Sequence, residues 1–76
     1  MNISELAEKI GNILEVEGDS VENSDNLDEF ENFDSFALIH ISVMIESNFN
    51  ISIEPEDFEV MISFKAIVGL IEERSK

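Results

Sequence analysis

The chain has 76 residues, enough for a single domain over residues 1–76 and too few for a second core. It contains 4 Lys and Arg against 18 Asp and Glu, which gives a formal net charge of −14. This acidity argues against nucleic-acid binding, which needs clustered basic residues, and against docking on an anionic membrane. The absence of cysteine excludes a disulfide framework, a cysteine-ligated zinc site and a thiol nucleophile on the chain itself.

Hydrophobic residues make up 43% of the chain, too many for a disordered acidic tail. The longest strongly apolar run, residues 36–45, is interrupted by His40 and Ser42 and is too short to span a bilayer. The first residues lack the basic segment of a secretory signal. We therefore expect a folded monomer in the cytoplasm with no membrane insertion.

The first predicted helix runs from about residue 3 to about residue 15. Its apolar residues recur at three- and four-residue spacing and so form one stripe. They are Ile3, Leu6, Ile10, Ile13 and Leu14. Asn2 and Glu5 have the spacing of a capping box, and Gly18 lies beyond the expected end.

Residues 15–34 are predicted to form a long connection that is rich in Asp and Glu and has no Lys or Arg. Leu27, Phe30 and Phe33 recur three apart and are the expected anchors of this segment, on a short helical turn. The acids do not fall at the ligand positions of a calcium-binding EF-hand loop. We therefore expect diffuse association with divalent ions and no dedicated metal site.

The second predicted helix runs from Ser35 through Phe49 and has two apolar faces. The expected core face consists of Leu38, Ile41, Ile45 and Phe49. A second stripe on nearly the opposite side consists of Phe36, Ile39 and Val43. Ala37, His40, Ser42 and Ser47 are expected at exposed positions. Because a surface helix needs one apolar stripe, either the third helix or the long connection covers the second stripe, or a partner docks there.

Two further helices complete the expected fold. Pro55 at a first-turn position, among acidic residues, predicts a short third helix. Ser63 is a candidate N-cap for a fourth helix, and Gly69 within that helix suggests a close helix contact. The sequence thus predicts an all-α fold, a small four-helix bundle with a long loop between helices one and two and a short third helix.

The pair Asp34 and Ser35 opens the second helix and has two interpretations. Asp or Ser before an apolar helix is an ordinary N-cap. Alternatively, Ser35 is modified by a phosphate-bearing group, which the free N–H groups and positive dipole end of the helix would tolerate.

Three segments in register with this pair resemble the acyl carrier protein family. They are residues 33–36 around Ser35, residues 45–49 at the end of the second helix, and residues 51–58 leading into the short third helix. The resemblance extends over nearly the whole chain. Two departures are Phe36, where the family has Leu, and Asn32, which tolerates left-handed backbone and stands near the family's Gly. The second helix also has fewer acids than is usual in the family.

The resemblance implies that Ser35 carries 4′-phosphopantetheine, transferred from coenzyme A by a phosphopantetheinyl transferase. Asp34 would assist that modification by helping to bind magnesium and the transferase. The arm would carry acyl groups as thioesters between enzymes with basic docking faces, and the bundle core would shelter the acyl chain. The predicted docking residues are Phe36, Ile39, His40, Val43 and Glu46.

The few acids on the second helix favour a specialised carrier over a housekeeping fatty-acid carrier. An alternative function is an unmodified acidic helical module that acts as an adaptor or inhibitor. An enzyme is the least favoured reading, because His40 points away from Ser35 on a helix and forms no relay with it.

Overall fold

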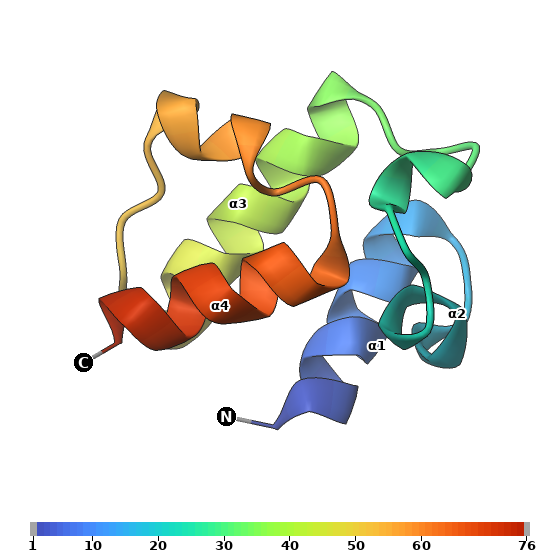
Figure 1. Ribbon diagram of the computed structural model, residues 1–76, viewed down its shortest axis with the longest axis horizontal. Coiled ribbons are helices and arrows are strands. Elements are labelled where there is room, and N and C mark those ends of the chain that lie inside the picture. The colour runs from blue at the N-terminus through green and yellow to red at the C-terminus, as the bar shows by residue number, and fades with distance from the viewer. Residues whose placement is uncertain (1, 76) are drawn as a thin grey trace.

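The computed structural model describes residues 2–75, which are helical and contain no strand (Figure 1). Three long helices form the body of the domain: α1 (Ile3–Leu14), α3 (Ser35–Phe49) and α4 (Phe64–Arg74). The connections contain the short helix α2 (Gly18–Glu22) and two 3₁₀ segments, η1 (Leu27–Glu29) and η2 (Pro55–Glu59). The all-α prediction is confirmed, and η2 is the predicted short helix before α4.

Helix α1 begins where the sequence predicts. The Asn2 side chain accepts a hydrogen bond from the Glu5 N–H at 3.0 Å, which satisfies one free donor of the first turn. The helix ends at Leu14 because Glu15 adopts left-handed backbone, with φ 61°. Its buried face consists of Leu6, Ala7, Ile10, Gly11 and Leu14.

The predicted loop after α1 contains a helix that the sequence analysis did not identify. Helix α2 lies directly beside α1 (Figure 1). Two glycines allow this approach: a Cβ on Gly11 would lie 2.6 Å from the Val16 carbonyl oxygen, and one on Gly18 would lie 3.0 Å from Glu8 Cα. Distances this short exclude a side chain at Gly11 without a shift of the backbone.

The remainder of this connection is anchored as predicted. Leu27 is fully buried on η1, and its N–H donates to the Ile62 carbonyl at 2.8 Å. Phe30 and Phe33 are half-buried against the core. Asn32, a residue type that tolerates left-handed backbone, does not adopt it here; its side-chain amide donates to the Leu14 carbonyl at 3.0 Å. The segment that leads to Ser35 is therefore tied to the end of α1.

The buried face of α3 includes small residues as well as the large apolar ones. Ile41 and Ile45 are fully buried as predicted. Ala37 and Ser42 were expected at exposed positions and are buried instead. Ala37 stands one turn before the buried Ile41 and so shares its face. The Ser42 hydroxyl donates to the Leu38 carbonyl at 2.9 Å, which satisfies it without water. Leu38 and Phe49, which were expected on the core face, are only half-buried and pack at the edge of the core.

An ion pair joins η2 to the end of α4. Arg74 donates to both carboxylate oxygens of Asp57, at 2.5 and 2.7 Å, and to the Ser52 carbonyl at 2.8 Å. The hydrogen bonds from Arg74 to the Asp57 carboxylate hold the pKa of that carboxyl below its ordinary value of 3.8. Helix α4 begins at the predicted cap, where Ser63 accepts the Ala66 N–H. Gly69 is exposed with no atom within 4 Å of an added Cβ, so the predicted close helix contact there is wrong.

Candidate functional site

Ser35 lies at the exposed entrance of α3. It is the first residue of the helix, and its side chain is on the surface. The preceding Asp34 is the N-cap: its Oδ1 accepts the Ala37 N–H at 2.9 Å, and its carbonyl accepts the Leu38 N–H at 3.0 Å. The hydroxyl of Ser35 is thus held on a capped and ordered helix end, open to solvent.

The same helix end can receive an anion. Within residues 2–75, the backbone N–H groups of Ser35 and Phe36 donate no hydrogen bond, as is usual for the first turn of a helix. These donors and the positive end of the helix dipole favour negative charge, including a phosphodiester, close to the Ser35 hydroxyl. The entrance of α3 therefore fits a phosphate-bearing group on Ser35, despite the acidity of the chain.

An apolar strip begins next to this hydroxyl. Phe36 is 75% exposed, Ile39 46% and Val43 54%. Of the two alternatives that the sequence left open, these exposures favour a stripe available to a partner over one covered by η2 or by the connection before α3. We call Phe36, Ile39 and Val43 the docking strip. The first Asp or Glu of α3 is Glu46, which lies beyond the last residue of the docking strip.

The two polar residues predicted at the docking surface are placed differently. His40 is exposed and lies one turn after Phe36 and one turn before Val43, on the side of α3 that carries the docking strip. Glu46 is half-buried, and its Oε2 accepts the Ile53 N–H at 2.8 Å. Glu46 therefore holds the segment after α3. This role could not be predicted, because the partner is seven residues away in an irregular segment.

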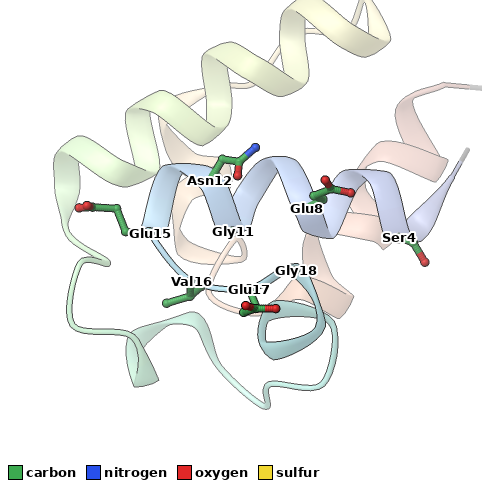
Figure 2. A pocket seen from close by; sticks show the side chains of 8 residues that line it. All are labelled: Ser4, Glu8, Gly11, Asn12, Glu15, Val16, Glu17 and Gly18. Carbon is green, nitrogen blue, oxygen red and sulfur yellow. The ribbon is translucent and has the colours of Figure 1, made fainter.

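A polar hollow of about 600 Å³ lies between α1 and α2. Figure 2 shows that the carboxylates of Glu8, Glu15 and Glu17 are spread along it and do not gather at one point. Across residues 2–75, no three His, Asp or Glu side chains are grouped as metal ligands require. In that same part of the chain, every helix is too short or too polar to span a bilayer.

A comparison with known proteins assigns most of the chain to a family. A protein-family model described as "Phosphopantetheine attachment site" matches residues 4–71, a stretch that includes Ser35 and most of the helical body. No curated protein matches the chain.

Proposed function

This chain belongs to the phosphopantetheine attachment site family, and on that premise we propose that Ser35 carries the prosthetic group and that the protein delivers acyl groups between enzymes. Members of the family are non-catalytic carriers of 4′-phosphopantetheine, so the protein is a carrier and not an enzyme. The observation that supports Ser35 is its exposed hydroxyl on the capped N-terminus of α3, beside two free N–H groups.

The chain contributes position and charge to this function. When attached, the group supplies a terminal thiol that holds an acyl group as a thioester, chemistry for which the cysteine-free chain has no residue of its own. The Ser35 and Phe36 N–H groups stabilise the phosphodiester at the helix end. Asp34 fixes the first turn through Ala37, and we assign its carboxylate a second role in binding magnesium and the transferase during modification.

The acidic surface and the docking strip would serve two different steps of partner binding, the attraction of a partner and the contact with it. Carrier domains are modified by phosphopantetheinyl transferases and interact with synthase enzymes. A formal charge of −14 steers basic partner faces towards this chain, and this attraction weakens as salt shortens the Debye length. The exposed apolar side chains of Phe36, Ile39 and Val43 then provide the contact beside Ser35. A cytoplasmic location accompanies this proposal, because the modification consumes coenzyme A.

We assign the protein to a specialised pathway, since Phe36 and His40 replace the Leu and the acid usual in the family. The double substitution Phe36→Leu with His40→Glu should raise acceptance of the carrier by fatty-acid synthase enzymes. Both positions are exposed, so the fold should tolerate the changes. Unchanged acceptance would count against specialisation.

Mass spectrometry tests the attachment site directly. The wild type, incubated with coenzyme A and a broad-specificity phosphopantetheinyl transferase, should gain the mass of one phosphopantetheine group. Ser35→Ala should gain none, whereas Ser47→Ala, which removes another exposed serine of α3, should gain one. A folded wild type that stays unmodified, or a modified Ser35→Ala protein, would refute the assignment.

A further inference from the structure

A groove of about 470 Å³ between α1 and α3 is lined by no acidic residue. Its lining consists of Lys9, Asn12, Ile13, His40, Val43 and Met44. All 18 Asp and Glu residues lie within residues 2–75, and none of them lines this groove. Val43 also belongs to the docking strip, so the groove extends that exposed apolar surface from α3 onto α1.

The few basic groups of the chain gather at this groove. Lys9 is the only Lys or Arg before Lys65, and His40 is the only His. The Lys9 ammonium donates to Asn48 Oδ1 at 2.7 Å and lies 3.6 Å from the Glu5 carboxylate. The side chains of Lys9 and Glu5 are 39% and 61% exposed, so their ion pair is weak and a carboxylate from outside can compete for the ammonium.

The floor of the groove is apolar. Ile13 and Met44 are half-buried and pack against the core, one from each helix. Figure 2 shows the Asn12 side chain pointing to the side on which α3 runs, so its amide adds a polar group to the rim. An apolar floor with a polar rim is the surface on which an amphipathic helix seats its apolar side chains, and a flexible Met adapts to their shape.

Charge decides which occupant suits this groove. A second copy would bring another −14, and an anionic lipid surface would be repelled in the same way. A basic segment would find no carboxylate in the lining and would meet Lys9 and His40. An apolar segment bordered by carboxylates complements both the floor and the rim. We infer that the groove receives an amphipathic helix of a partner enzyme, with an apolar side chain against Ile13 and Met44 and a carboxylate towards Lys9 and His40.

This inference rests on the function proposed above and divides the partner's surface into two zones. The acids of residues 15–34 and 54–59 attract basic residues of the partner. The groove instead meets a part of the partner that is apolar and acidic. A partner whose contact face is basic throughout would place positive charge against Lys9 and His40, so the groove selects among carrier-dependent enzymes.

The test uses two synthetic helical peptides of identical composition, each with a stripe of Leu, two Glu and two Lys. In the first peptide the Glu residues border the stripe and the Lys residues lie on the opposite face; in the second they are exchanged. Because both peptides have zero net charge, the field of the acidic chain does not favour one by its total charge. Amide chemical shifts of the carrier are followed during titration with each peptide.

The first peptide should bind more tightly and shift the amides of Ile13, His40, Val43 and Met44. One exposed ion pair changes the affinity by up to about fivefold, so contacts to both Lys9 and His40 should give a preference of severalfold. Equal affinities, tighter binding of the second peptide, or no binding of either would overturn the inference.

Two lysine substitutions separate the groove from the total charge. Lys9→Glu and Lys65→Glu make the net charge more negative by the same amount, but Lys65 is exposed in the first turn of α4 and lies outside the groove. Lys9→Glu should abolish the preference for the first peptide, and Lys65→Glu should preserve it. His40→Glu should act like Lys9→Glu, which keeps the test informative if the change at Lys9 disturbs α1. An equal effect of the Lys9 and Lys65 substitutions would overturn the inference.

Mass spectrometry of the same wild-type protein distinguishes failure of this inference from failure of the proposed function. A wild type that gains the arm at Ser35 but does not discriminate between the peptides overturns only the inference. A folded wild type that gains no arm overturns both, because the partner is then no carrier-dependent enzyme.

Discussion

Asp34 has two separable roles at the entrance of α3, and a pair of substitutions distinguishes them. Its Oδ1 accepts the Ala37 N–H at 2.9 Å and so stabilises the first turn. Under the proposed function, its carboxylate also assists modification of Ser35. Asn retains an acceptor oxygen and is about as good an N-cap as Asp, whereas Ala offers none. We therefore expect Asp34→Ala to lose both roles and Asp34→Asn to lose only the second.

The loss of the cap is large enough to measure. Replacing an N-cap Asp by Ala costs about 1 kcal/mol of unfolding free energy. A domain of this size without disulfides has roughly 3–5 kcal/mol in total. The corresponding fall in Tm is about 4–8 °C, which thermal unfolding followed by circular dichroism resolves. Asp34→Asn should stay within about 0.5 kcal/mol of the wild type.

Ser63→Ala is the matched control for Asp34. Ser63 caps α4 through the same kind of hydrogen bond, to the Ala66 N–H at 3.1 Å. Its loss should lower Tm by a similar amount and leave the initial rate of arm transfer to Ser35 unchanged when measured below the unfolding transition. If Asp34→Asn is modified as fast as the wild type, the carboxylate is only a cap. If Asp34→Ala keeps the wild-type Tm, the capping argument is wrong.

Four further properties follow from the structure and the charge of the chain. Gly69→Ala should raise the unfolding free energy in urea by up to about 1 kcal/mol, because the glycine is exposed within α4 and an added Cβ meets no atom within 4 Å; no gain would contradict this. Gly11→Ala should instead destabilise, since its Cβ would lie 2.6 Å from a backbone oxygen. The pKa of Asp57 is lowered by Arg74, so its contribution to stability is present above about pH 4 and is lost as pH falls through the lowered pKa. Asp57→Asn should therefore reduce the loss of stability on acidification, and an unchanged acid limb of the pH–stability curve would refute the role of this pair. Raising NaCl from 0.1 to 1 M should increase Tm, because the Debye length shortens from about 10 to about 3 Å and screens repulsion within a chain of net charge −14; a Tm independent of salt would show that this repulsion is unimportant.

The long helices could be predicted because each has a cap and an apolar stripe of sufficient length. Asn2, Asp34 and Ser63 all accept the predicted kind of N-cap hydrogen bond. The exposure of the docking strip was one of two outcomes that the sequence left open: a small domain has little protein to bury both apolar faces of a helix, but the third helix or the long connection could have covered part of one. The periodicity of α3 therefore indicated the surface next to Ser35 as well as the fold.

Features that depend on tertiary contact escaped prediction. Helix α2 has five residues, too few to show a helical period, and it is held by close approach at Gly11 and Gly18. Ser42 was assigned to the surface as a polar residue, yet it bonds within its own helix. A groove between α1 and α3 could not be predicted from either helix alone, because Ile13 lines it from one helix and Met44 from the other.

The position of Arg74 has a practical consequence for handling this protein. Its guanidinium donates hydrogen bonds to a carboxylate 17 residues earlier in the chain and to the Ser52 carbonyl, which lies earlier still. Removing the last turn of α4 would therefore release the stretch that leads out of α3, at the opposite end of that helix from Ser35. A tag or fusion partner joined downstream of α4 needs a spacer that leaves the hydrogen bonds of Arg74 undisturbed.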